Sequence, residues 1–288
     1  MIPRPIEELI EDLDEYTGIT KYDLVDEAVA RREEITPHLL AILERMLADP
    51  ETWLDEEHDS HCYALVLLTH FGETKAHRLI VDLFSLPGEL PYELFGDMVG
   101  ETLPAALVKT CGGSLDGIRE LILNRQADDY SRWSACTALS YAVMAGMISR
   151  QEALDIFCSL LTGEEAEPES MFWTGVVATL IDLHPAETLE VIERAYAAGL
   201  VAESYTDMEY IRDKAVSDRD TILAELREEY ERRTPDNIHQ YMNWWQESGK
   251  ERPDAPAPLA ATAKRERKQK DKRRKKSKMA KKSRKRNR

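Results

Sequence analysis

The stretch SRWSACTALSYAVMAGMISRQEALDIFCSLLT, residues 131–162, predicts two amphipathic helices joined by a tight turn. In its first half, Cys136, Leu139 and Val143 recur at helical spacing and form one apolar face. Three alanines beside them leave room for a second helix to approach closely: Ala135, Ala138 and Ala142. A helix pair this short cannot bury both apolar faces alone, so the pattern predicts neighbouring pairs of the same kind.

The turn within this stretch carries clear stop and start signals. Gly146 ends the first helix, because glycine adopts the left-handed cap conformation without a side-chain penalty. Ser149 begins the second helix, and Glu152 three residues later completes a capping box. The second apolar face then includes Phe157 and Leu160.

Three further stretches, beginning at residues 58, 96 and 169, follow the same helix–turn–helix plan. Aligning the four units gives steps of 39, 35 and 39 residues between equivalent apolar positions: Ala64, Leu103, Ala138 and Val177. A period in the high thirties with two helices per unit indicates a HEAT-like α-solenoid. The sequence therefore predicts an all-α protein, built from paired antiparallel helices.

The remaining segments predict five successive parts. Residues 1–57 are expected to form helices that cap the array, and residues 58–200 the HEAT-like repeats. Residues 201–248 are expected to form further helices and an aromatic cap, IHQYMNWW, that closes the end of the array. Residues 249–263 form a linker rich in Pro and Ala, and residues 264–288 a disordered basic tail, because they carry too few apolar side chains to fold.

One helix within the N-terminal segment has its own start signal. Thr36 followed by Pro37 is typical of an N-cap and a first helical position, so we expect a helix to begin there. The preceding helix is expected to end near Glu34.

The charge of the chain divides sharply between its two parts. The last 25 residues carry 17 Lys or Arg against two acidic residues, a charge of +15. The preceding 263 residues carry 21 basic and 52 acidic residues, a charge of −31. An acidic body would attract basic protein partners and repel nucleic acid. The tail has the opposite preference.

The tail supplies the candidate nucleic-acid-binding residues. Cations at this density displace counterions from a polyphosphate, so binding should weaken steeply as salt rises. The tail has no Phe, Tyr or Trp on which bases could stack, which predicts contact with RNA, DNA or the ribosome without sequence preference. The candidates are Lys264, Arg265, Arg267, Lys268, Lys270, Lys272, Arg273, Arg274, Lys275, Lys276, Lys278, Lys281, Lys282, Arg284, Lys285, Arg286 and Arg288.

The chain shows no signal for secretion or for a membrane. Its acidic N-terminus lacks an apolar signal core, and its longest strongly apolar run, residues 63–68, is too short to span a bilayer. The four cysteines form no CxxC pair and are expected to be buried thiols in a reducing compartment. These features predict a cytoplasmic protein without a membrane partner.

A cluster around His58 is the weak candidate for a metal site. His58, His61 and Cys62 are spaced by three and four residues, which on a helix would place all three on one face. A fourth ligand would have to come from His70 or His77. The competing interpretation is an ordinary helix start with Cys62 packed inward, so we predict no bound metal.

The His58-Asp59 pair also resembles the motif of the all-helical HD phosphohydrolases. Their metal site needs a further histidine and a distal aspartate, for which His38 is available. The pair is followed by Ser-His-Cys rather than the usual Ile-Gly. A metal-dependent hydrolase therefore stays an alternative.

No other segment indicates catalysis or a cofactor. Gly112-Gly113-Ser114 precedes a helix and could cradle a phosphate, but it lacks a P-loop lysine and is explained as an inter-helix turn. The chain has neither GxSxG nor HExxH, and its many acid pairs are typical of solvated helix faces. We expect no catalytic residues, no cofactor and no enzymatic activity.

Three blocks, within residues 96–122, 131–157 and 182–201, resemble one family: GDMVGETLPAALVKTCGGSLDGIRELI, SRWSACTALSYAVMAGMISRQEALDIF and DLHPAETLEVIERAYAAGLV. This is the mainly bacterial family called domain of unknown function 1186, and the resemblance covers about residues 22–210. It implies a helical, HEAT-like repeat fold and no reaction. Many members end in a zinc-binding SEC-C motif, CPCGSGKKYKKCC, but no cysteine follows Cys158 here, so no zinc role is carried over.

These observations favour a non-enzymatic interaction protein. Its acidic solenoid would bind a protein partner and its basic tail would contact nucleic acid or a ribonucleoprotein. A scaffold or chaperone for basic proteins, with the tail folded back on the acidic body, is the first alternative. The metal-dependent helical hydrolase is the second.

Overall fold

The computed structural model describes residues 4–15, 20–54, 58–202 and 205–247. These residues form sixteen α-helices and two 3₁₀ helices, and their only β pairing is two isolated bridges. The predicted all-α class is therefore confirmed. Contacts divide the chain into two compact units, Met1–Gln246 and Glu247–Arg288, and the predicted linker and tail lie outside the described residues.

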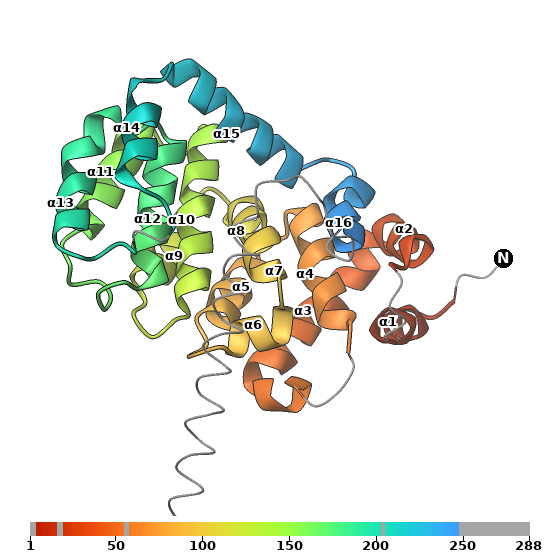
Figure 1. Cartoon of the computed structure of the whole chain (residues 1–288). Helices are drawn as coiled ribbons and strands as arrows, with labels where there is room; N and C mark the ends of the chain where they lie inside the picture. Colours follow the sequence, from red (N-terminus) through yellow and green to blue (C-terminus); the bar gives the residue numbers. More distant parts are fainter. Residues whose placement is uncertain (1–3, 16–19, 55–57, 203–204, 248–288) are drawn as a thin grey trace, which may run out of the picture. The chain divides into compact units, whose positions relative to one another are not determined.

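Four helix pairs lie where the repeat period predicts them, and Figure 1 shows them in succession from orange to green. The pairs are α4 (Ser60–Phe71) with α5 (Ala76–Phe84), α8 (Leu103–Thr110) with α9 (Asp116–Leu123), α10 (Asp129–Met144) with α11 (Arg150–Leu160), and α12 (Met171–Asp182) with α13 (Leu189–Ala197). The first helices pack in order, α4 on α8, α8 on α10 and α10 on α12. The four equivalent residues are fully buried: Ala64, Leu103, Ala138 and Val177. The paired-helix solenoid arrangement is thus confirmed.

The turn between α10 and α11 has the predicted geometry. Gly146 adopts φ = 72°, and Met147 N donates to the carbonyl of Ala142 at 2.9 Å, which closes the end of α10. The Ser149 hydroxyl accepts from Glu152 N at 3.2 Å, and the Glu152 carboxylate accepts from Ser149 N at 3.0 Å. The capping box is therefore complete.

Helix α10 is the centre of the fold because helices surround it. It contacts α8, α9, α11 and α12, and also α7 (Met98–Glu101) and α15 (Arg219–Arg233). Its surroundings bury a charged residue, Arg132, which is only 1% exposed. The Arg132 guanidinium lies 3.6 Å from the Phe172 ring and donates to the carbonyls of Ile122 (2.9 Å) and Glu165 (3.1 Å). These contacts join α9, α10, α12 and the loop before α12.

Three helices and a 3₁₀ helix precede the first pair: α1 (Ile6–Asp14), α2 (Tyr22–Ala30), α3 (Arg32–Ala48) and η1 (Pro50–Leu54). The predicted helix start at Thr36 and Pro37 is wrong, because α3 begins at Arg32 and continues through the proline. Thr36 donates to the carbonyl of Arg32 at 2.7 Å instead of capping a helix. Pro37 has no backbone N–H, so the carbonyl of Glu33 lacks its usual hydrogen-bond donor within the helix. Water can donate to this carbonyl instead, because Glu33 is exposed.

The segment after the repeats forms α14 (Met208–Val216), α15 and α16 (Ile238–Glu247). Figure 1 shows α15 extending from α14 back towards α16, which lies beside α2. Along this path the Tyr230 ring lies 5.6 Å from that of Tyr141, and Arg233 forms an ion pair with Glu101. Two short helices, α6 (Leu90–Phe95) and the 3₁₀ helix η2 (Ala186–Thr188), complete the described residues.

Helix α16 does not lie at the C-terminal end of the repeats, where the order of the sequence suggested an aromatic cap. His239 Nε2 lies 2.7 Å from the carboxylate of Asp26 in α2, and its ring is 4.6 Å from that of Tyr22. Tyr241 is buried beside the hydroxyls of Thr69 and Thr102. Thr69 lies in the repeat helix α4, and Thr102 directly precedes the repeat helix α8. The aromatic helix therefore covers the N-terminal helices and the first repeats.

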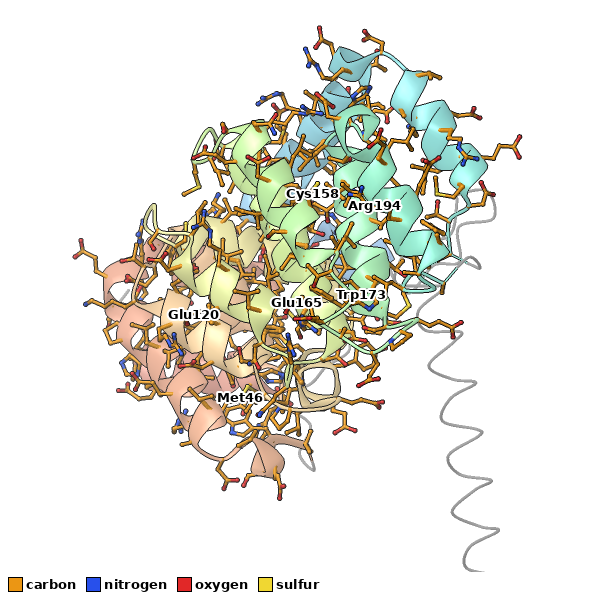
Figure 2. All side chains as sticks on the ribbon, turned by 90° about the vertical axis from the view of Figure 1, so that its left-hand side faces the viewer. Met46, Glu120, Cys158, Glu165, Trp173 and Arg194 are labelled. Atoms are coloured by element: carbon orange, nitrogen blue, oxygen red, sulfur yellow. The ribbon has the colours of Figure 1, made fainter. Side chains whose placement is uncertain are left out.

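Figure 2 shows the second helices of the last three pairs side by side, marked by Glu120 on α9, Cys158 on α11 and Arg194 on α13. Each of these helices carries two acidic residues: Asp116 and Glu120, Glu152 and Asp155, and Glu190 and Glu193. All six except the half-buried Glu193 are exposed.

Within the part of the chain that is described, none of the helices has both the length and the apolar character needed to cross a bilayer.

Candidate functional site

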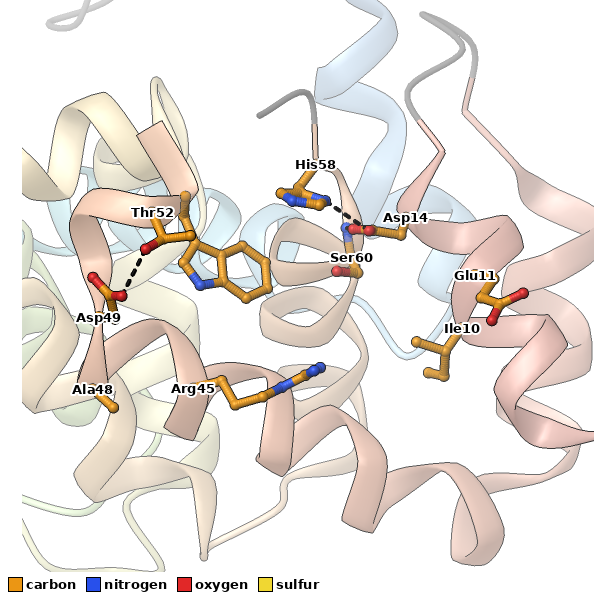
Figure 3. Close-up of a pocket in the computed structure, with 10 residues that line it drawn as sticks. Ile10, Glu11, Asp14, Arg45, Ala48, Asp49, Thr52, His58 and Ser60 are labelled. Atoms are coloured by element: carbon orange, nitrogen blue, oxygen red, sulfur yellow. Dashed lines mark hydrogen bonds and ion pairs between the residues drawn. The ribbon is translucent and has the colours of Figure 1, made fainter. Parts of the chain in front are cut away.

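A cleft of about 570 Å³ lies in the N-terminal part of the fold (Figure 3). Its walls come from the second half of α1, the last turn of α3, η1 and the start of α4. Helical periodicity directs Ile10 and Asp14 of α1 to one wall, and the exposed Arg45 comes from α3. Trp53 of η1 and His58, just before α4, also line the cleft.

Asp14 and His58 form a hydrogen-bonded pair at this cleft. His58 Nδ1 lies 2.7 Å from Asp14 Oδ2, and the backbone N–H of Ser60 donates to Asp14 Oδ1 at 3.1 Å. The backbone holds the pair, because Asp59 N donates to the carbonyl of Asp14 at 3.1 Å. Asp14 therefore serves as the anchor between the end of α1 and the start of α4.

The protonation of this pair follows from its contacts. Burial alone would raise the pKa of Asp14, but hydrogen bonds from Ser60 and His58 outweigh it and lower that pKa below its ordinary value. The carboxylate is therefore ionised near neutral pH and only accepts hydrogen bonds. It follows that His58 Nδ1 carries the proton that it donates to Asp14.

The other acidic groups at the cleft differ in their surroundings. Asp49, directly after the end of α3, accepts a hydrogen bond from the hydroxyl of Thr52 at 2.6 Å. Asp59 follows His58 in the chain but does not line the cleft; it is half-buried, and burial raises its pKa above the ordinary value, an effect that nearby Lys21 opposes. Glu11 is exposed on α1 and extends away from Arg45 in Figure 3.

Trp53 forms the aromatic wall of the cleft. Its ring centroid lies 5.1 Å from that of His58 and 5.7 Å from that of His61. His61 is buried, and its ring centroid also lies 5.4 Å from that of Phe95. The indole is itself half-buried.

The three weak metal candidates do not lie together as a ligand set. His58 precedes α4, which begins at Ser60, so the one-face argument does not apply to it. His61 turns inward, and its Nε2 donates to the carbonyl of Leu94 at 2.8 Å. Burial lowers the pKa of His61 to about 4, and burial also raises the pKa of the Cys62 thiol, so both are neutral near pH 7. Among the described residues, no cluster of three His, Cys, Asp or Glu side chains is arranged to hold a metal ion.

The glycine pair before α9 serves as a turn. Gly112 and Gly113 adopt φ values of 60° and 93°, which are strained for other residues. The Ser114 hydroxyl turns to the carboxylate of Asp116, 2.9 Å away. A phosphate bound at this turn would therefore lie close to an acidic group.

All seventeen basic candidates of the tail lie outside the described residues.

Sequence reasoning singled out His58 but missed its partners. Asp14 lies 44 residues earlier in the chain, and no local pattern links the two. Arg45 and Trp53 are also ordinary residues of a helix end and a short turn in the sequence. Only the packing of α1, α3, η1 and the start of α4 brings these side chains together.

The fold and the cleft define an all-α protein of successive helix pairs, with a cleft of mixed charge among its N-terminal helices. The chain belongs to the family described as protein of unknown function (DUF1186), whose sequence model matches residues 4–248. The resemblance noted in the sequence is thus confirmed, over a longer range than residues 22–210.

Two relatives support this assignment, and both bear the name uncharacterized protein. One is from Chlamydia muridarum (strain MoPn / Nigg) and is 32% identical over 205 residues, which cover 71% of this chain and 82% of the relative. The other, from Chlamydia trachomatis serovar D, is also 32% identical over 205 residues and covers 71% and 81%. No solved structure matches the chain.

Proposed function

We propose that this protein is a non-enzymatic interaction protein. Its acidic helical repeats bind a protein partner, and its polybasic tail contacts nucleic acid or a ribonucleoprotein without reading sequence. The observation that carries this proposal is the separation of charge, +15 in the last 25 residues and −31 in the rest. Two opposite charges in one chain favour two different classes of partner.

The second helices offer the surface for the protein partner. Acidic residues recur on α9, α11 and α13, including the exposed Glu120, Asp155 and Glu190. Their first helices are held in a buried core, so the acidic side chains are presented on a fixed scaffold. Helical repeat arrays bind partners along such extended surfaces. A basic protein is the partner that this surface favours.

The nucleic-acid half of the proposal is tested by fluorescence anisotropy of a labelled RNA in a series of salt concentrations. The full chain is compared with a truncation to residues 1–252 and with a variant whose tail residues are scrambled in order. We expect the full chain and the scrambled variant to bind with the same steep salt dependence, and the truncation not to bind. RNA binding that survives truncation, or that depends on tail order, would contradict this half.

A second candidate is a scaffold or chaperone for basic proteins, which the acidic second helices also favour. In that case the tail competes with the partner for the acidic surface. Binding of a polylysine peptide to the full chain and to the 1–252 truncation distinguishes the two. The second candidate requires tighter binding after truncation, whereas the first requires no change.

A further inference from the structure

Arg45 is a cation without a carboxylate partner among the described residues. Its Nε donates to the carbonyl of Ala41 in its own helix, at 3.3 Å, and the side chain is exposed. Figure 3 shows it extending from α3 into the cleft, towards the side of Ile10. The neighbouring arginines of this region, Arg4 and Arg31, are both paired with Glu27. Within the described ranges, Arg45 therefore differs from these two arginines in having no carboxylate partner.

Three acidic residues line the cleft, and in the described part of the chain none of them forms an ion pair with Arg45: Glu11 extends away from it, and Asp14 and Asp49 have other partners. The Asp14 carboxylate is engaged by His58 and by the backbone of Ser60, and the Asp49 carboxylate by Thr52. The Arg45 guanidinium repels a cation that lies near it. An anion would gain a charge-assisted hydrogen bond there, and arginine is well suited to carboxylate and phosphate groups.

The rest of the cleft is suited to an apolar group. The half-buried side chains of Trp53 and Ile10 provide an aromatic and an aliphatic wall. The His58 ring, fixed by Asp14, lies 5.1 Å from the indole. Sites for small molecules combine such apolar walls with a few oriented polar groups.

We infer that this cleft binds a small organic anion, a carboxylate or phosphate joined to a flat apolar group. Arg45 contacts the anionic head, and Trp53 and Ile10 enclose the apolar part. The inference does not depend on the proposed function, because it involves neither the tail nor the second helices.

Fluorine NMR of the full chain labelled with fluorotryptophan tests this inference. The chain has five tryptophans, and the Trp53 resonance is assigned as the one missing from a Trp53→Phe variant. The tail contains no tryptophan, so ions bound to it leave this resonance in place. The probes are benzoate and phenyl phosphate, with neutral benzyl alcohol and cationic benzylamine as controls for charge.

We expect benzoate or phenyl phosphate to shift the Trp53 resonance saturably, with a Kd on the order of 1 mM, and more strongly than either control. Arg45→Gln should weaken this binding roughly tenfold, because a charge-assisted hydrogen bond is lost. Arg119→Gln removes the same charge from exposed α9 and should leave the Kd unchanged. Glu11→Gln removes a competing negative charge and should tighten binding a few-fold.

The two anions distinguish the possible head groups, since preference for benzoate indicates a carboxylate ligand and preference for phenyl phosphate a phosphate. The inference is overturned if no probe shifts Trp53 saturably, or if benzylamine binds as well as the anions. It is also overturned if Arg45→Gln and Arg119→Gln weaken binding equally. A circular dichroism spectrum of each variant confirms that the exposed substitutions leave the helices intact.

Discussion

Gly175 of α12 lies directly against the indole of Trp133 in α10, where the two central helices cross. A Cβ atom added at position 175 would come within 2.4 Å of Trp133 Cγ, a distance that no real Cβ contact tolerates. The close approach lets α12 bury Trp133 almost completely, to 7% exposed. The absence of a side chain at this one position thus determines how near the third and fourth pairs can pack.

Gly175→Ala should therefore destabilise the protein despite the better helix propensity of alanine. Overpacking a rigid core costs about 1–3 kcal/mol. Urea denaturation followed by circular dichroism measures the loss. Gly100→Ala in α7 is the matched control, because nothing lies within 4 Å of a Cβ at that position, and it should leave stability unchanged or slightly raised. Equal effects of the two substitutions would refute the crossing argument.

Arg132→Met should destabilise the protein by about 2–4 kcal/mol, because the buried carbonyl of Ile122 and the part-buried carbonyl of Glu165 lose their donor and the Phe172 ring loses its cation. Methionine keeps much of the apolar stem, so the loss reports on the guanidinium. Arg119→Met on exposed α9 serves as the control and should change stability by less than about 0.5 kcal/mol. Thermal and urea unfolding check both values, and a neutral Arg132→Met would mean that these contacts contribute nothing net.

Ser149→Ala should cost about 1 kcal/mol, the usual loss for an N-cap serine in a complete capping box. The Ser159 hydroxyl, by contrast, donates to the carbonyl of Ile156 at 2.7 Å within the same helix, away from its start. Ser159→Ala should therefore be close to neutral. Urea unfolding of the two variants side by side measures the difference, which should disappear if the capping box has no energetic role.

Stability should decline in acid through Glu187. Hydrogen bonds from Arg150, at 2.8 and 2.9 Å, lower the pKa of Glu187 from 4.5 to about 2, against an opposing effect of burial. A carboxyl whose pKa is lower in the folded state contributes stability above its unfolded pKa and loses it as pH falls through the folded value. The contribution is therefore lost between about pH 4.5 and pH 2.

Glu187→Gln removes this titrating group and should flatten the decline in that pH window, while it lowers stability at pH 7. Arg150 also donates to the carbonyls of Leu183 and His184, so Arg150→Gln should cost more at pH 7 than Glu187→Gln does. Unfolding free energies across the acid range check the expectation. An unchanged slope in Glu187→Gln would assign the acid sensitivity to other carboxylates.

The helix pairs could be predicted because their signals are local. Apolar spacing, Gly146 and the Ser149–Glu152 box act within a turn or two of backbone, and neighbouring pairs of the same kind supply the missing burial. Pro37 shows where a local rule fails. The buried residues Ile35 and Leu39 on either side hold α3 together through the proline, so tertiary packing overrides the start signal.

The candidate site, in contrast, depends on contacts between distant parts of the chain. Asp14 meets His58 across 44 residues, and α16 returns to place His239 against Asp26, 213 residues away. Sequence spacing contains no information about such pairs, because they arise only when helices dock.

The sequence by itself therefore determined the all-α class, the repeated helix pairs, their caps and the separation of charge, since hydrogen bonding and burial within one pair require only nearby residues. The tertiary structure alone decided which side chains share a space: Arg132 inside the core, Trp133 against Gly175, and the Asp14–His58 pair in one cleft with Arg45. The physical reason is that each of these arrangements depends on where one helix axis lies relative to another. That placement results from the packing of the whole core rather than from any single stretch.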